Sequence, residues 1–263
     1  MPKRVRFSLN RFAEPTLPDG SPEVRFGLVE GETLFETRSP WSQEKGAAYA
    51  LADVRLLPPC WPSKIVGVGR NYREHASELG NPVPAEPLIF LKPPSALVAS
   101  GDAIVYPSLS ARVDYEGELG VVIGKRARQV RPQEAESCIL GYTCVNDVTA
   151  RDLQKKDGQF TRGKGFDTFC PVGPWIVPRE EADFERLRIR TFVNGELKQD
   201  ASVEEMIFSP GAIIAFVTQF MTLEPGDLIA TGTPAGVGPL EPGSVVRVEI
   251  DGVGVLENRV QRG

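Results

Sequence analysis

Alternation of polar and apolar residues predicts short β-strands in the first part of the chain. Residues 3–10 (KRVRFSLN) alternate in this way, and residues 23–37 repeat the pattern on either side of Glu30-Gly31. A period of two is typical of a strand with one buried face, and a break that contains glycine is typical of a tight turn. The pattern predicts a small β-rich N-terminal module over residues 1–56, followed by a proline-rich linker, residues 57–62 (LPPCWP).

The remaining patterns predict many strands and few helices. Residues 64–68 (KIVGV) form a continuous apolar run, which is typical of a buried strand. Asn194-Gly195 divides residues 188–198 into a hairpin, because both residues tolerate the positive φ angles of a tight turn. Residues 210–221 have the broad apolar face of a helix. We therefore expect a mixed β-rich (α+β) fold, with a second, larger domain over residues 57–263.

The run from Val113 to Gly124 (VDYEGELGVVIG) is the first candidate for chemistry. If it forms a single strand, Glu116 and Glu118 project from one face, and the apolar residues that begin at Leu119 project from the other. Two half-buried carboxylates side by side repel each other unless a cation compensates them. The alternative is a surface strand with a polar face, which the E-x-E pattern favours when it is taken alone.

A third carboxylate follows another strand-like run. Asp147 comes directly after residues 143–146 (TCVN), just before a helix that we expect to begin near Thr149. Together with Glu116 and Glu118 it would provide three hard oxygen ligands. Such a set suits Mg²⁺, Mn²⁺ or Ca²⁺, with water or substrate at the remaining positions.

The single histidine has a glutamate three residues away. His75 and Glu78 lie in YREHASELG, a short helical pattern that ends at Gly80. This spacing places both side chains on one face of a helical turn. A carboxylate can orient an imidazole and raise its pKa, so the pair suits proton transfer near neutral pH. The alternative is the exposed polar face of a surface helix.

Two lysines and a glycine-rich loop complete the candidate set. Lys164 lies between two glycines, which would let the backbone approach an anionic ligand closely or would form a solvent-exposed loop. Lys92 ends a predicted strand and either points into a cleft or lies at the surface. Thr231 and Thr233 lie in a loop that could present hydroxyl and backbone N–H groups to a carboxylate.

Composition narrows the class of protein. A chain of 263 residues with 41% hydrophobic and 25% charged residues is ordinary for a globular protein with a sizeable core. The net charge of −5 argues against a nucleic-acid partner, and the single histidine excludes zinc sites built on two or three histidines. The four cysteines include no C-x-x-C pair, which indicates reduced thiols in the core. Neither a signal peptide nor a membrane-spanning run is visible, so we expect a cytoplasmic protein.

Five runs, taken in order, resemble the fumarylacetoacetate hydrolase family, and these are GVGRNYREHASELG, FLKPPSAL, DYEGELGVVIG, GYTCVNDVTARDLQ and GDLIATGTPAGVG. The resemblance covers residues 62–263. It implies a rolled, partly barrel-like set of mixed β-sheets with few short helices, and a homodimer.

The resemblance also implies roles for individual residues. They are the metal ligands Glu116, Glu118 and Asp147, the catalytic residues His75, Glu78 and Lys164, and the substrate-binding residues Arg70, Lys92, Gln154 and Thr233. In such proteins the segment that carries the histidine and the glutamate orders as a lid over substrate. The charged loop 155–163 stands where the family varies and would help to set substrate choice.

Together, the resemblance and the candidate chemistry predict an enzyme that acts on 2-oxo or 2-enol acids through a metal-chelated enolate. Three reactions are open: isomerisation, C–C bond hydrolysis of an acylpyruvate, and decarboxylation of oxaloacetate. We favour isomerisation of the 2-hydroxyhepta-2,4-diene-1,7-dioate type in aromatic-acid catabolism, with Mg²⁺ or Mn²⁺ as cofactor and Ca²⁺ as an alternative. An inactive, cation-stabilised binding protein is the alternative of another class, and the His75–Glu78 pair argues against it.

Overall fold

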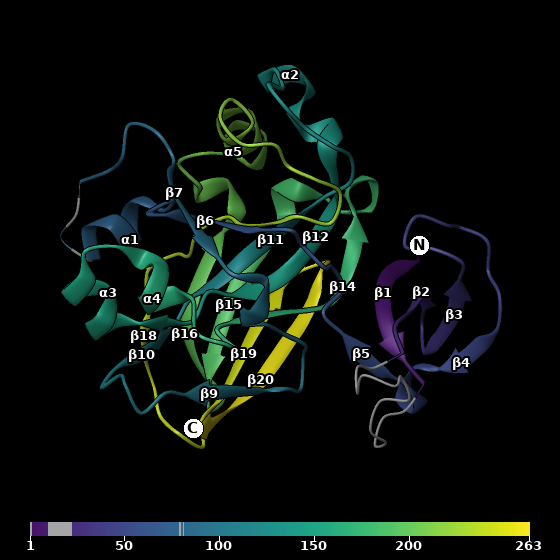
Figure 1. Ribbon diagram of the computed structural model, residues 1–263, viewed down its shortest axis with the longest axis horizontal. Helices are drawn as coiled ribbons and strands as arrows, with labels where there is room; N and C mark the ends of the chain where they lie inside the picture. The colour runs from purple at the N-terminus through teal and green to yellow at the C-terminus, as the bar shows by residue number, and fades with distance from the viewer. Residues whose placement is uncertain (1, 10–22, 79, 81) are drawn as a thin grey trace.

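The protein has the predicted mixed β-rich fold with few short helices (Figure 1). The structure is a computed structural model that describes residues 2–9, 23–78, 80 and 82–263. Residues 10–22, which include the end of the first predicted strand and much of the predicted N-terminal module, lie outside these ranges. The α-helices of the described part are α1 (Arg73–Glu78), α2 (Pro132–Ala135), α3 (Arg151–Asp157), α4 (Phe160–Lys164) and α5 (Pro210–Val217).

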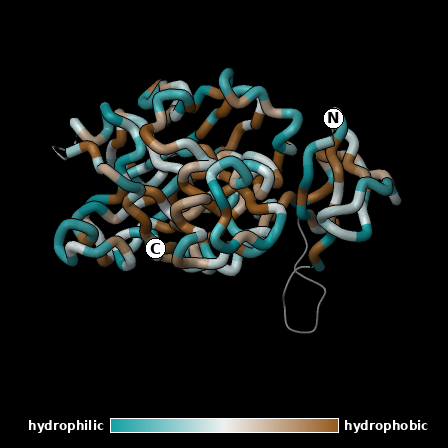
Figure 2. Tube along the Cα trace, turned by 90° about the horizontal axis from the view of Figure 1, so that it is seen from above, coloured by the Kyte–Doolittle hydropathy of each residue, from teal (hydrophilic) through white to brown (hydrophobic). Residues whose placement is uncertain are grey.

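The largest sheet extends through both lobes of the molecule. Its strands are, in order, β4 (Ala48–Ala50), β3 (Thr33–Thr37), β2 (Arg25–Glu30), β1 (Lys3–Ser8), β14 (Cys170–Pro178), β12 (Ile139–Asn146), β11 (Gly117–Ile123), β17 (Leu228–Ala230), β6 (Ile65–Gly69) and β7 (Leu88–Lys92), with β5 (Arg55–Leu57) beside β1 and β8 (Leu97–Val98) beside β14. Strands β1–β5, labelled in Figure 1, form the smaller lobe, which carries the N-terminus in Figure 2. Because β5 crosses the predicted boundary after residue 56, the division into two domains stays a prediction.

Two smaller sheets complete the main lobe. The three-stranded sheet has the order β13 (Thr149–Ala150), β10 (Val113–Tyr115) and β18 (Gly238–Leu240). The five-stranded sheet has the order β16 (Glu196–Ser202), β15 (Arg188–Val193), β19 (Val245–Ile250), β20 (Gly254–Arg262) and β9 (Ala103–Tyr106). The predicted Asn194-Gly195 hairpin is confirmed, because both residues have positive φ angles and β15 pairs with β16 antiparallel.

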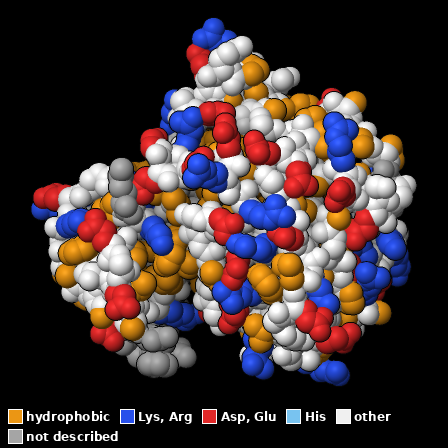
Figure 3. Space-filling view, turned by 180° about the vertical axis from the view of Figure 1, so that it is seen from behind, with side chains coloured by type: hydrophobic (Ala, Val, Ile, Leu, Met, Phe, Trp, Pro, Cys, Tyr) orange, Lys and Arg blue, Asp and Glu red, His pale blue; other side chains and the backbone are white. Residues whose placement is uncertain are grey.

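Short 3₁₀ helices connect several of these elements, and they are η1 (Leu51–Asp53), η2 (Pro94–Ala96), η3 (Glu136–Cys138), η4 (Arg179–Glu181), η5 (Phe184–Arg186) and η6 (Val203–Glu205). In the described part of the chain, no helix is long and apolar enough to cross a membrane. Charged side chains of both signs are interspersed over the back of the main lobe (Figure 3).

The run from Val113 to Gly124 is two strands rather than the single strand that its alternation predicts. The chain leaves the three-stranded sheet after β10 and enters the largest sheet at β11, so the two strands have different neighbours. Glu116 lies at this change of sheet. Both faces of β11 are covered, since Glu118 and Leu119 are both buried, and the polar surface strand is therefore wrong.

The predicted loop over residues 155–163 is mostly helical. Helix α3 continues to Asp157, Gly158 adopts the left-handed conformation at its C-terminus, and α4 begins at Phe160. A glycine in this position ends one helix without preventing the next. The predicted loop is therefore wrong for most of this segment.

The main core lies between the largest sheet and the five-stranded sheet. Leu119, Val121 and Ile123 of β11 belong to one apolar cluster with Ile189 of β15 and Val248 of β19. The apolar face predicted for this strand is therefore confirmed. All four cysteines are free and buried, in agreement with the role expected for them in the core.

Asp227 joins the linker before β6 to the turn before β17. Its side chain is fully buried, and Oδ1 accepts hydrogen bonds from the backbone N–H of Ser63 at 2.8 Å and of Lys64 at 3.2 Å. Oδ2 accepts from the Glu224 N–H at 2.8 Å and lies 2.5 Å from Lys64 Nζ. Burial raises the pKa of Asp227, but these donors lower it more, so the pKa lies below its ordinary value.

The substitution Asp227→Asn should lower the free energy of unfolding by about 2 kcal/mol at about pH 7, because buried donors lose a charged acceptor. The folded pKa is depressed, so the carboxylate stabilises the fold above the unfolded pKa of about 4 and loses this effect as the pH falls through the folded pKa. We expect the difference in free energy of unfolding between the wild type and the variant, measured with urea, to be smaller at about pH 3 than at about pH 7. The exposed Asp53→Asn serves as control. An equal loss at both pH values would contradict the role of the charge.

Candidate active site

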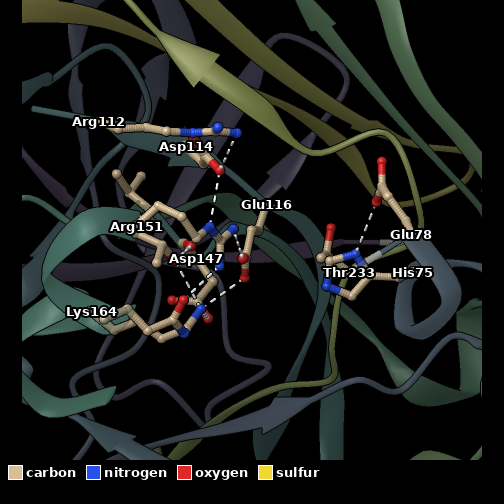
Figure 4. A network of polar contacts seen from close by, with 12 residues as sticks. His75, Glu78, Arg112, Asp114, Glu116, Asp147, Arg151, Lys164 and Thr233 are labelled. Atoms are coloured by element: carbon tan, nitrogen blue, oxygen red, sulfur yellow. Dashed lines mark hydrogen bonds and ion pairs between the residues drawn. The ribbon is translucent and has the colours of Figure 1, made fainter. Parts of the chain in front are cut away.

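Three acidic side chains meet where the largest sheet and the three-stranded sheet join. Glu116 lies between β10 and β11, Glu118 lies in β11, and Asp147 directly follows β12. One carboxylate oxygen from each lies within 4.8 Å of the others, and all three residues are buried. The structure therefore brings together the residues predicted as metal ligands, and Figure 4 labels Glu116 and Asp147 among them.

Backbone pairing brings Asp147 to the glutamates. Strands β11 and β12 pair antiparallel with Gly117 opposite Asn146. The Asp147 N–H donates to the Glu116 carbonyl oxygen at 2.8 Å, and the Glu116 N–H donates to Asn146 Oδ1 at 3.0 Å. The two segments that carry the acids are thus joined through their backbone groups and through the Asn146 side chain.

Cationic side chains compensate two of the three carboxylates. Lys164 Nζ lies 2.8 Å from Glu116 Oε2 and 2.5 Å from Asp147 Oδ2. Lys92 Nζ lies 2.5 Å from Asp147 Oδ1. Arg151 Nη2 lies 2.5 Å from Glu116 Oε1. Burial by itself raises the pKa of Glu116, but Lys164 and Arg151 hold this pKa well below its usual range.

Glu118 has no ion-pair partner in the part of the chain that the structure describes. It accepts a hydrogen bond from the Gly232 N–H at 2.8 Å. Burial and the charges of Asp147 and Glu116 raise the pKa of Glu118 well above its ordinary value. A buried carboxylate of this kind is costly without a cation, and carboxylate oxygens are the ligands that Mg²⁺, Mn²⁺ and Ca²⁺ prefer. The donor set therefore fits a divalent cation.

The predicted His75–Glu78 pair forms on α1. His75 Nδ1 lies 3.3 Å from Glu78 Oε2, and the histidine is buried. The Glu78 carboxylate also accepts from the Gly236 N–H, at 3.1 Å and 3.3 Å to its two oxygens. Asn71, just before the helix, donates from Nδ2 to the Thr231 carbonyl oxygen at 2.7 Å. Helix α1 is thus bonded at both ends to the loop that follows β17.

A cleft of about 530 Å³ joins the acidic cluster to the histidine. Its lining residues are Val68, Gly69, Arg70, His75, Glu78, Phe90, Glu116, Glu118, Arg151, Gln154, Lys155, Gly158, Phe160, Lys164 and Thr233. Figure 4 shows the histidine pair and Thr233 on one side of this region, with Lys164 and Arg151 on the other.

The predicted substrate-binding residues differ in what their polar atoms contact. Arg70 lines the cleft and has no hydrogen bond or ion pair with any described residue. Gln154 Oε1 accepts from Arg151 at 2.8 Å, and the Thr233 hydroxyl donates to the Gly117 carbonyl oxygen at 2.8 Å. Lys92 is 1% exposed, contacts Asp147, and is not among the residues that line the cleft.

Sequence reasoning missed Arg151, which lies between two buried acids. Its Nε lies 3.0 Å from Asp114 Oδ2, and its Nη2 contacts Glu116. The spacing of three between Arg151 and Gln154 on a helix was the available signal, because it places both on one face. The Asp114 partner gives no such signal, since strand pairing across the three-stranded sheet brings it close.

Residues 64–261 match the family described as Fumarylacetoacetate (FAA) hydrolase C-terminal. Residues 11–59 match the family described as Rv2993c-like, N-terminal. The first match extends over most of the chain and includes every predicted site residue.

Individual proteins resemble the chain over most of its length. The crystal structure of 2-hydroxyhepta-2,4-diene-1,7-dioate isomerase from Mycobacterium marinum is 45% identical with a TM-score of 0.87, and the match covers 100% of this chain and 99% of that one. Oxaloacetate tautomerase YisK from Bacillus subtilis is 44% identical over 89% of this chain and 82% of its own. Maleylpyruvate hydrolase from Sphingobium sp. SYK-6, solved with manganese (II) ion and pyruvate, is 32% identical with a TM-score of 0.80 and 100% coverage of both chains.

The predicted resemblance is therefore confirmed by the family match, by the fold and by the buried acidic cluster. The chain belongs to the fumarylacetoacetate hydrolase family of enzymes.

Proposed function

We propose that the protein is a Mg²⁺- or Mn²⁺-dependent enzyme that shifts a proton on a 2-oxo or 2-enol dicarboxylic acid, as in isomerisation of 2-hydroxyhepta-2,4-diene-1,7-dioate. The observation that carries this proposal is the single cleft shared by the His75–Glu78 pair and the carboxylates Glu116 and Glu118. A proton-transfer pair that faces a cluster of hard oxygen ligands suits enolate chemistry. The names of the isomerase from M. marinum and the tautomerase from B. subtilis support a proton shift.

Glu116, Glu118 and Asp147 would hold the cation, which supplies, when bound, a Lewis acid that favours the enolate form of a 2-oxo acid. The manganese and pyruvate in the related hydrolase support this assignment. Lys164 and Arg151 line the same part of the cleft. Their positive charges would orient the carboxylate of the substrate and stabilise an oxyanion.

His75 would move the proton. When Nδ1–H donates to Glu78, Nε2 has a free lone pair that can accept a proton from the 2-hydroxyl group of a 2-enol acid, or from the carbon beside the carbonyl group of a 2-oxo acid. The same nitrogen then returns this proton to a different atom of the conjugated chain, so that no group is gained or lost. The Gly236 N–H holds the Glu78 carboxylate and so keeps the imidazole in one orientation.

Two unpaired cations favour a dicarboxylic substrate. Arg70 and Lys155 line the cleft, and neither has an ion pair with any described residue. A carboxylate at the far end of the substrate would complement them, and Arg can bind it in bidentate fashion.

The second candidate function is C–C bond hydrolysis of an acylpyruvate. His75 Nε2 could equally accept a proton from water, and the apolar side chains of Val68, Phe90 and Phe160 in the cleft suit an acyl group. Decarboxylation of oxaloacetate is the third alternative.

A panel of dienedioates, acylpyruvates and oxaloacetate, assayed with Mg²⁺ and with Mn²⁺, separates the three reactions by their products. We also propose a homodimer, from the family resemblance, and a cytoplasmic location, from the free cysteines.

Glu118→Gln should abolish metal binding without destabilising the metal-free protein. The substitution keeps the size of the side chain and replaces a buried carboxyl group that has no ion pair with any described residue. We expect Mn²⁺ to raise the melting temperature of the wild-type protein and not that of the variant, as measured by thermal unfolding. The exposed Glu241→Gln is the control and should behave as wild type. An undiminished Mn²⁺ effect in the Glu118 variant would refute the assignment of this ligand.

His75→Asn should lower kcat by a factor of about 10² to 10⁴, because the variant lacks a base for proton transfer. Mn²⁺ binding, measured by calorimetry, should stay within about twofold of wild type, since His75 is not one of the proposed ligands. Glu74→Gln, an exposed residue of the same helix, is the matched control and should keep full activity. Unchanged kcat in the histidine variant would rule out its role as the base.

Arg70→Met should raise KM for dicarboxylic 2-oxo acids by about tenfold or more, because it removes one charge-assisted contact. KM for a monocarboxylic acylpyruvate should change by about twofold or less. Steady-state kinetics on both substrate classes checks this difference. Lys156→Met removes a nearby exposed charge that does not line the cleft, and it should leave both KM values unchanged. An equal rise in KM for the two classes would contradict a site for the distal carboxylate.

A further inference from the structure

Gln199 contacts two segments beside the acidic cluster, namely the backbone between Glu116 and Glu118 and the loop after β17. It lies on β16, is 1% exposed, and is not among the cleft-lining residues. Its Oε1 accepts from the Gly117 N–H at 3.0 Å. Its Nε2 donates to Thr233 Oγ1 at 2.8 Å and to the Pro234 carbonyl oxygen at 2.9 Å. Every polar atom of this buried amide therefore has a partner at the site.

These contacts close a ring of hydrogen bonds around Gly117. The Thr233 hydroxyl accepts from Gln199 and donates to the Gly117 carbonyl oxygen at 2.8 Å. The N–H and C=O of Gly117 belong to the two peptide groups that lead to Glu116 and Glu118. Because those peptide groups set the directions in which the neighbouring side chains leave the backbone, the ring orients both carboxylates.

The ring stands where strand pairing is missing. Strand β17 pairs with β11 only from Gly120 to Val122, and after Thr231 the chain continues as a loop. The backbone groups of Gly117 are buried on that side and need other partners. The five-stranded sheet comes close enough to supply them, since a Cβ on Gly117 would lie 2.0 Å from Thr191 Oγ1 of β15.

Gln199 also contacts the loop that donates a hydrogen bond to Glu118. Its two donor contacts fix Thr233 and Pro234. Gly232, directly before them, donates its N–H to Glu118 Oε2 at 2.8 Å. One amide thus connects the strand that carries the acids with the loop that orients one of them.

We infer that Gln199 is a positioning residue of the metal centre, which sets the affinity for the divalent cation by holding Glu116 and Glu118 through Gly117 and Thr233. This role is indirect, because among the described residues Gln199 forms no hydrogen bond with the side chain of a proposed metal ligand, and it reaches the cleft only through Thr233. The inference rests on the metal binding in the proposed function and does not depend on which reaction follows.

Gln199→Met tests this role, because methionine keeps the length of the side chain and removes all three hydrogen bonds. The dissociation constant for Mn²⁺, measured by calorimetry on the full chain without substrate, should rise about tenfold or more. Thr233→Val opens the ring at another point and should have a similar effect, whereas Thr233→Ser keeps the hydroxyl and should bind Mn²⁺ as the wild type does. If the ring acts as a unit, the double variant Gln199→Met/Thr233→Val should bind no more weakly than the weaker single variant.

Ile250→Ala separates positioning from stability. Ile250 is buried on β19 of the same sheet and takes no part in the ring, so its loss should lower the stability and leave the Mn²⁺ dissociation constant unchanged. A folded Gln199→Met protein that binds Mn²⁺ within about twofold of wild type would overturn the inference. If that variant does not fold, the Mn²⁺ affinities of Thr233→Val and Thr233→Ser test the inference instead. Equal affinities of these two variants would overturn the inference. Wild-type Mn²⁺ binding without turnover of any 2-oxo acid would contradict the proposed function alone.

Discussion

Repulsion among three buried carboxylates is the constraint on which the site depends. Electrostatic interactions are stronger away from water, so both the repulsion and its compensation are large here. The compensating cations come from three different elements, namely Lys92 at the end of β7, Arg151 at the start of α3 and Lys164 at the end of α4. Helices α3 and α4 are therefore needed to hold the acids close together, because they carry Arg151 and Lys164. Glu118 forms no ion pair with any of these three side chains, and it is therefore the carboxylate that a bound cation would stabilise most.

Parallel pairing of β6 and β17 brings the catalytic candidates to the same edge of the sheet. Their register places Val66 beside Ile229, so both strands end at the same side. Helix α1 follows the first strand, and the loop with Thr233 follows the second. Because the carboxyl ends of parallel strands lie together, His75 and Thr233 meet despite their separation in sequence. The same edge receives the acids from β11.

The sequence predicts the acids better than their surroundings. The E-x-E spacing and the carboxylate after TCVN predict Glu116, Glu118 and Asp147 as candidate metal ligands, because charged residues are unusual within apolar runs. The change of sheet at Glu116 could not be read from the alternation, since it depends on which distant strands pair with each half of the run. Gln199 looks like an ordinary polar residue of a hairpin, and only the contact between two sheets gives its amide a role at the site. The sequence also predicts Lys92 at the end of a strand. It does not indicate that the Lys92 ammonium contacts Asp147, because this contact depends on how distant strands are arranged.

The pairing of β1 with β14 gives the N-terminal strands a structural role that is separate from catalysis. Lys3 Nζ lies 3.9 Å from the centre of the Trp175 ring, and this tryptophan packs against the apolar cluster that contains Val5 and Phe7. Strand β1 covers part of the β14 edge at Arg4 and Ile176. A protein that lacked these strands would present an open sheet edge beside an uncovered tryptophan, which is a template for self-association. The small lobe thus covers an edge of β14 that could otherwise pair with a strand of another molecule.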